Sequence, residues 1–155
     1  MNKKSKAARF KPLQKIAEHH EQQAAVIMSS SRKVLNDTEQ RLVDLINFRE
    51  DYTQQIFTSG KRGISGARLQ GLYQFVNQLD LAIEQQKQMI VRAQMECEQH
   101  TKKWQLKHKK TTILINTVSR FENNERLIGQ KQEQKLLDEH NQQRVQFKRN
   151  QDKIT

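Results

Sequence analysis

The chain has 155 residues, of which 34% are hydrophobic, 6% aromatic and 29% charged, and its formal net charge is +11. This is too little apolar material for a compact core of ordinary thickness. It is enough for a narrow seam between helices, in which only two positions in seven are apolar. The length suits one domain, residues 1–155, and the abundant Gln, Lys, Glu, Leu and Arg are good helix formers. The composition therefore favours long, thinly packed helices.

A first helix is predicted from about residue 11 to 57. Pro12 fits its first turn, where the missing N–H costs nothing. Apolar residues follow at gaps of three, four or seven, and after three weak helix formers at 29–31 they continue one residue out of phase. The first register contains Phe10, Leu13, Ala17, Ala24, Ile27 and Val34, and the second contains Leu35, Leu42, Leu45, Tyr52 and Ile56. The pattern predicts one helix with a local shift of its seam.

The glycines predict the one reversal of the chain. Four of the five lie between residues 60 and 71, and glycine accepts backbone angles that other residues resist. A loop is therefore expected at about 58–66. Although Lys61 and Arg62 lie beside it, no GxxxxGK[ST] string and no preceding strand are present, so phosphate binding is not expected.

A second helix is predicted from about residue 67 to 148, followed by a frayed tail at 149–155. A 3.5-residue repeat runs through it without a slip, as in a coiled coil. The repeat contains Leu69, Leu72, Val76, Leu79, Ile83, Gln86, Ile90, Ala93, Cys97, His100, Trp104, Lys107, Thr111, Leu114, Val118, Phe121, Glu125 and Ile128. Two seams joined by a short loop predict an all-α, monomeric, antiparallel two-helix coiled-coil hairpin with a longer second helix.

The unequal arms predict an overhang on the second helix. Folding about residue 62 places Phe10 opposite Leu114, so about thirty residues of the second helix project past the first. Val118, Phe121 and Ile128 continue the seam there and are expected to lack a partner within the hairpin. An exposed apolar stripe on a helix indicates a binding surface; the alternative is that this part frays in solution.

Positive charge is concentrated near the two ends of the sequence. Residues 1–15 carry six cations and no acid, and residues 101–155 sum to +7. Such a field should steer an acidic partner toward these segments. Nucleic acid is the other common partner of a basic chain, but no nucleic-acid motif and no interleaved aromatic residues accompany the cations. A solvated basic face without a partner is a further alternative.

No constellation predicts catalysis, a metal or a cofactor. Glu96 and His100 share a helical face, but they lack an HExxH context. Cys97 lies on the seam and is interpreted as a small core residue. A two-helix body offers no concave pocket for chemistry, so an enzyme is not expected. Residues 111–118 form the longest weakly polar run, which is too short to span a bilayer, and with no signal peptide the cytoplasm is the expected location.

Several short matches occur in order along nearly the whole chain. They are Phe10-x-Pro12-Leu13, Leu45 through Tyr52, the block Tyr73-Gln74-Phe75-Val76-x-x-Leu79-x-x-Ala82-Ile83-Glu84-Gln85, Trp104, and Gln134-Lys135-x-x-Asp138-Glu139. With these residues the sequence resembles the FliJ family of the flagellar type III export apparatus. The N-terminus is longer and more basic than is usual in the family.

The resemblance implies a stalk-like protein, similar to the gamma subunit of rotary ATPases. Its helix termini would enter the ring of the export ATPase FliI and promote ring assembly and activity. It would also bind the export gate protein FlhA and export chaperones, at the cytoplasmic face of the inner membrane, and so serve motility and chemotaxis. The alternatives are a basic coiled-coil adaptor, a nucleic-acid-binding protein, or the equivalent stalk of a virulence type III secretion system.

Two sets of candidate partner-binding residues follow. Residues spaced i, i+4, i+7 and i+11 form a stripe that partly overlaps the seam, which either docks the gate or widens the seam. The gate set is Tyr73, Phe75, Leu79, Ala82 and Gln86. The set expected to contact the ATPase ring is Arg9, Phe10, Lys11, Lys103, Lys107, Lys110, Val118, Phe121, Ile128 and Lys135.

Overall fold

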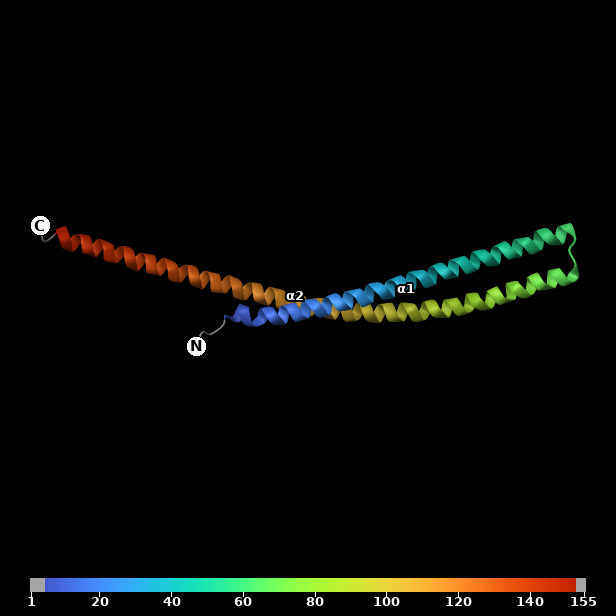
Figure 1. Ribbon diagram of the computed structural model, residues 1–155, viewed down its shortest axis with the longest axis horizontal. Helices are drawn as coiled ribbons and strands as arrows, with labels where there is room; N and C mark the ends of the chain where they lie inside the picture. The colour runs from blue at the N-terminus through green and yellow to red at the C-terminus, as the bar shows by residue number, and fades with distance from the viewer. Residues whose placement is uncertain (1–4, 153–155) are drawn as a thin grey trace. The chain divides into compact units, whose positions relative to one another are not determined.

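The computed structural model describes residues 5–152. They form two helices, α1 (Lys6–Arg62) of 57 residues and α2 (Gly66–Asp152) of 87 residues, and no strand lies among them. The two helices run antiparallel from the turn that joins them (Figure 1). The predicted all-α hairpin with a longer second helix is confirmed.

Both helices begin earlier and end later than their sequence patterns suggested. α1 starts at Lys6 because Ser5 caps it: the Ala8 N–H donates to the Ser5 Oγ at 3.1 Å, and the Arg9 N–H donates to the Ser5 carbonyl at 3.2 Å. Pro12 therefore lies inside α1 and not in its first turn, where it was predicted. Its missing N–H removes one helical hydrogen bond.

The structure describes only part of the predicted tail and of the basic N-terminal cluster. α2 continues to Asp152, so residues 149–152 of the predicted frayed tail are helical. The rest of that tail, and Lys3 and Lys4 of the basic N-terminal cluster, lie outside the described residues.

The turn is shorter than the glycines suggested and occupies residues 63–65. Gly63 has a φ of +77°, the left-handed region that favours glycine. The Ser65 side chain then caps α2, because its Oγ accepts a hydrogen bond from the Arg68 N–H at 3.3 Å. Gly60 and Gly66 belong to the helices. One glycine and one capping serine therefore reverse the chain.

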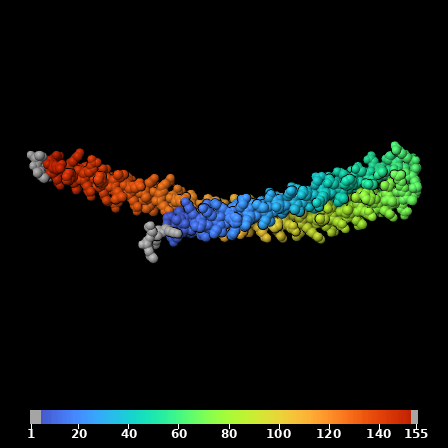
Figure 2. Space-filling model, viewed as in Figure 1, coloured from blue at the N-terminus to red at the C-terminus, as the bar shows by residue number. Residues whose placement is uncertain are grey.

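The structure divides into two units, which are described separately. The turn unit is Glu21–Lys107, and the terminal unit comprises the described residues 5–20 and 108–152. In the turn unit the last turns of α1 and the first turns of α2 pack side by side (Figure 2). The single coiled-coil domain expected from the sequence remains a prediction.

In the turn unit, the seam of α1 keeps one register throughout. Except for Ala25, its less exposed positions are connected by steps of four and three residues; they are Glu21, Ala24, Met28, Ser31, Leu35, Thr38, Leu42, Leu45, Arg49, Tyr52, Ile56 and Ser59. The predicted shift after residue 31 is therefore wrong. Ile27 and Val34, which were assigned to the seam, are exposed, and Met28 and Leu35 take their places.

The seam of α1 contains polar residues, so a search for apolar residues in the sequence does not find its register. The Ser31 hydroxyl donates to the Met28 carbonyl at 2.8 Å, and the Thr38 hydroxyl donates to the Val34 carbonyl at 2.6 Å. Because these hydroxyls are satisfied within their own helix, they can occupy a seam without an unpaired polar group.

The seam predicted for α2 agrees with the buried positions almost throughout. In the turn unit, Val76, Leu79, Ile83 and Ala93 are buried. Lys107 is an exception, because it is exposed. No large side chain among the described residues is completely buried, since two helices cover only one side of each other.

The terminal unit has its own short seam. On α1 the less exposed residues are Ala7, Phe10, Gln14 and Ala17, and Leu13, which was predicted there, is exposed. On α2 the seam continues through Thr111, Leu114, Val118, Phe121 and Glu125. Among the described residues beyond Glu125, only Gly129 is half-buried, and every residue from 130 to 152 is exposed.

Candidate partner-binding surfaces

The residues predicted to dock the gate do not share one exposed face in the turn unit. Leu79 and Gln86 are buried in the seam. The Gln86 Nε2 donates a hydrogen bond of 2.8 Å to the Thr38 carbonyl on α1. This buried bond uses a side chain that was expected to face a partner, and a buried polar pair of this kind can fix the register of two helices.

Phe75 and Tyr73 lie on opposite sides of the seam. The Phe75 ring packs against the Tyr52 ring of α1, with centroids 4.5 Å apart and planes tilted by 53°. Such a tilted pair is a favourable aromatic contact. Ala82 lies one heptad beyond Phe75 on α2 and is half-buried. Tyr73, by contrast, is 54% exposed and lines a groove on the other flank of the hairpin.

This groove, called here the turn groove, lies between the end of α1 and the start of α2. Its volume is about 620 Å³, and its lining residues are Arg49, Thr53, Ile56, Phe57, Gly60, Lys61, Leu69, Tyr73 and Val76. Phe57 is 65% exposed, and the Lys61 Nζ lies 4.5 Å from the centroid of its ring. A cation this close to an aromatic face is held by the ring quadrupole.

At the end of the groove away from the turn, the Arg49 guanidinium donates a hydrogen bond to the Asp80 carboxylate. This hydrogen bond, with the carboxylate charge, raises the pKa of Arg49. The positive charge of Arg49 is thus already matched by Asp80, whereas no acid among residues 5–152 pairs with Lys61.

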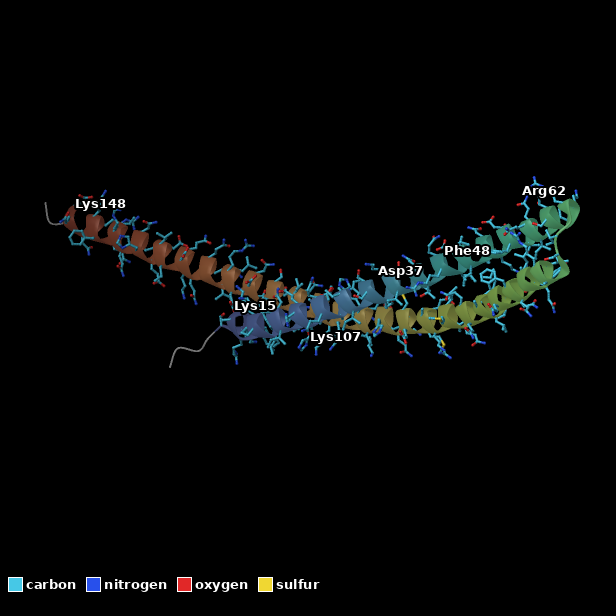
Figure 3. All side chains as sticks on the ribbon, turned by 45° about the vertical axis from the view of Figure 1, so that its right-hand side comes forward. Lys15, Asp37, Phe48, Arg62, Lys107 and Lys148 are labelled. Atoms are coloured by element: carbon cyan, nitrogen blue, oxygen red, sulfur yellow. The ribbon has the colours of Figure 1, made fainter. Side chains whose placement is uncertain are left out.

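The sequence predictions missed Phe57 and Lys61 as candidate site residues. The signal that could have found them is the distribution of acids, because residues 52–79 contain Lys61, Arg62 and Arg68 but no Asp or Glu. Figure 3 shows Arg62 at the turn end of α1. The aromatic side chains of Phe57 and Tyr73 lie in the same acid-free part of the hairpin.

In the terminal unit, Val118 and Phe121 have partners on α1. The sequence predicted that both lack one. Val118 is only 3% exposed, and the Phe121 ring packs against the Phe10 ring with centroids 5.3 Å apart. Phe10 thus faces Phe121 and not Leu114. The prediction failed because α1 begins earlier than expected and the chain reverses after residue 62.

The start of α1 is held by two acids of α2. The Lys11 Nζ lies 2.7 Å from a carboxylate oxygen of Glu122, and the Ala7 N–H donates to the Glu125 carboxylate at 3.3 Å. The hydrogen bond to Glu122, with its charge, raises the pKa of Lys11. α1 has no acid in its own first turn, so Glu125 provides the negative charge that a helix N-terminus favours.

The other predicted ring-contact residues are exposed. Arg9, Lys110, Ile128 and Lys135 lie on the surface of the terminal unit, and Lys103 and Lys107 lie on that of the turn unit. Part of the basic cluster at the start of α1 is therefore neutralised by the Lys11–Glu122 pair, whereas these cations remain on the surface.

The α2 extension (residues 130–152) is a single exposed helix. All of its residues are exposed, and Lys148 marks it in Figure 3. Its large apolar side chains are Leu136, Leu137, Val145 and Phe147, all more than half exposed. Five cations and four acids give this segment a net charge of only +1. Its apolar residues, more than its charge, distinguish it from ordinary solvent-facing helix.

Groups that could support chemistry are sparse. No cluster of three His, Cys, Asp or Glu side chains that could hold a metal occurs within residues 5–152. Cys97 is half-buried in the seam of the turn unit. Neither helix, over its described length, contains an apolar stretch that could cross a membrane.

A family model described as flagellar FliJ protein matches residues 5–150. The chain belongs to the FliJ family. The match spans both helices and confirms the resemblance seen in the sequence. Membership makes the chain a component of the flagellar export apparatus, a type III secretion system. No curated protein and no solved structure matches the chain.

Proposed function

We propose that this member of the FliJ family is the stalk of the export apparatus, and that its terminal unit binds the ring of the export ATPase FliI. The observation that carries this proposal is the α2 extension, in which a helix continues for residues 130–152 with every side chain exposed. A helix of this length is marginal by itself in water, so a binding partner would stabilise it.

The terminal unit would offer the ring two kinds of contact. Leu136 and Phe147 are eleven residues apart and share one face of the extension, which suits an apolar groove in a partner. Arg9 and Lys110 add exposed positive charge on the same unit. Electrostatic contacts of this type increase the association rate, and salt weakens them.

The turn unit would then link the ATPase to the export gate FlhA and to export chaperones. Its aromatic residues and unpaired cations near the turn support this part of the proposal. Bound to these partners, the chain would lie at the cytoplasmic face of the inner membrane, without inserting into it. The matched family is flagellar, which favours this reading over a virulence system. The chain would act as a monomer and without catalysis of its own.

The decisive experiment measures ATP hydrolysis by purified FliI with the full-length chain and with a chain that ends at Gly129. This cut removes the extension and leaves the Phe10–Phe121 contact intact. We expect the full chain to stimulate hydrolysis and the shortened chain to give no stimulation, with an unchanged melting temperature. Equal stimulation by both chains would refute binding through the extension. Binding to nucleic acid with no effect on FliI would favour the adaptor alternative.

A further inference from the structure

We propose that one flank of the terminal unit is a contact surface for an anionic phospholipid membrane. This surface, called here the basic flank, comprises Lys6, Arg9, Leu13 and Ile16 of α1 and Lys110, Ile113, Arg120 and Leu127 of α2. Its cations contact lipid phosphates, and its apolar side chains reach the headgroup layer while both helices stay on the surface. The inference goes beyond the proposed function, because it gives the terminal unit a partner other than the ATPase ring.

The register of the seam places these residues on one side of the helix pair. Lys6, Leu13 and Lys110 each directly precede a residue of the seam. The other members lie three residues beyond one of these, or one or two heptads further still, so they share that side. The opposite flank is marked by Lys11, which directly follows a seam residue and pairs with Glu122.

The basic flank carries four cations and no acid. None of the four forms an ion pair within residues 5–152. The acids of residues 5–20 and 108–127 all have partners elsewhere. Glu122 and Glu125 hold the start of α1, and Glu18 accepts a hydrogen bond of 2.9 Å from the Gln14 side chain. The positive charge of the flank is therefore available to an external anionic surface.

Aliphatic side chains are interleaved with these cations along both helices. Leu13, Ile16, Ile113 and Leu127 are between 50% and 60% exposed. A membrane surface offers a contact for both kinds of side chain in one plane, since its phosphates lie directly above apolar lipid chains. Covering the four aliphatic side chains would also remove apolar area from water.

Other anionic partners match this combination less well. A nucleic acid would bind the cations through its phosphates, but bases stack on aromatic rings, and the apolar members of the flank are all aliphatic. In the proposed function the ATPase ring binds the α2 extension, with Arg9 and Lys110 beside it. Because these two cations belong to both surfaces, the ring and the membrane would compete for the terminal unit.

The test is flotation of the full-length chain with vesicles over a range of lipid concentrations. One set is phosphatidylcholine alone, and the other is phosphatidylcholine and phosphatidylglycerol in equal parts. The wild-type chain should bind the anionic set at least about thirtyfold more tightly. Lys110→Glu combined with Arg120→Glu should weaken this binding about thirtyfold at low salt and less at high salt. Ile113→Gln should weaken it about fivefold at both, because glutamine preserves the helix and removes the apolar contact.

Matched variants on the opposite flank serve as controls. Lys15→Glu combined with Arg126→Glu makes the same change of charge, and Ile115→Gln makes the same apolar change two residues from Ile113. Lys15, Arg126 and Ile115 each directly follow a seam residue. Both controls should bind within about threefold of the wild type at physiological salt, since charges further than a Debye length from the membrane are screened. All variants should melt near the wild-type temperature, because every altered side chain is exposed.

Selective loss of vesicle binding in the variants of the basic flank supports the inference. Equal binding of the wild-type chain to both vesicle sets overturns it, and so does wild-type affinity in the flank variants. If those variants keep vesicle binding and lose binding to a nucleic acid duplex, the flank serves a nucleic acid and the inference is wrong. If they keep vesicle binding and lose stimulation of FliI, the flank belongs to the ring contact, and the inference is again wrong. Failure of the wild-type chain to stimulate FliI, together with selective loss of vesicle binding, would refute the proposed function and support the membrane contact.

Discussion

The turn unit and the α2 extension differ in how much of α2 is covered: most of its seam is buried or half-buried in the turn unit, and every residue of the extension is exposed. In the turn unit, α1 covers the seam positions of α2, with Lys107 as the exception. In the extension the seam positions carry Gln132, Lys135 and Glu139, and all are exposed. A coiled-coil seam stabilises a helix only where a second helix covers it. α2 therefore continues as a helix well beyond the residues that are buried in a seam.

Amide hydrogen exchange should give the largest contrast between the two regions. Amides of the extension should exchange at least about a hundredfold faster than those around Val76 to Ala93, because nothing in the hairpin covers the extension. Adding FliI should slow exchange in the extension and not around Val76 to Ala93. Equal protection in both regions of the free chain would show that the extension is stabilised by itself, and would remove the main support for a missing partner.

A pair of neighbouring residues tests the continuous register of α1. Leu35→Ala removes a seam side chain and should lower the free energy of unfolding by about 2 kcal/mol. Val34→Ala, one residue away and exposed, should change it by less than about 0.5 kcal/mol. Urea denaturation of the two variants provides the measurement. A larger loss from Val34→Ala would restore the shifted register that the sequence suggested.

Two valines of α2 compare the paired and extended parts of the terminal unit. Val118→Ala should destabilise this unit by about 1 to 3 kcal/mol, because Val118 is buried against α1. Val145→Ala in the extension should have almost no effect on thermal melting followed by circular dichroism. Similar losses would mean that the extension packs on something in the free chain.

The smallest expected effect concerns the Lys11–Glu122 pair. Because Glu122 raises the pKa of Lys11, the stabilisation by this pair is complete below the ordinary lysine pKa. It disappears as the pH rises through the raised value. Lys11→Met should therefore destabilise the protein slightly at neutral pH and not at strongly alkaline pH. Melting curves of both chains at the two pH values test this, and a difference that persists at alkaline pH would exclude the pair as its cause.

Sequence periodicity was enough to predict the α2 seam, since thirteen of its eighteen positions are apolar and the register does not slip. It was not enough for α1. Gln14, Ser31 and Thr38 occupy seam positions there, while Leu13, Ile27 and Val34 lie exposed beside them. A search for apolar residues therefore selected the neighbours. The physical reason is that a narrow seam tolerates polar side chains that are satisfied within their own helix.

The sequence by itself determined the helical class, the single reversal, the longer second helix and the family. Local propensity and a short repeat specify these features without reference to distant residues. Only the tertiary structure decided which residues face each other. It paired Phe10 with Phe121, buried Gln86 against the Thr38 carbonyl and divided Tyr73 from Phe75. These pairings depend on where the reversal falls, and in an antiparallel hairpin a shift of the turn by a few residues changes every partner along both arms.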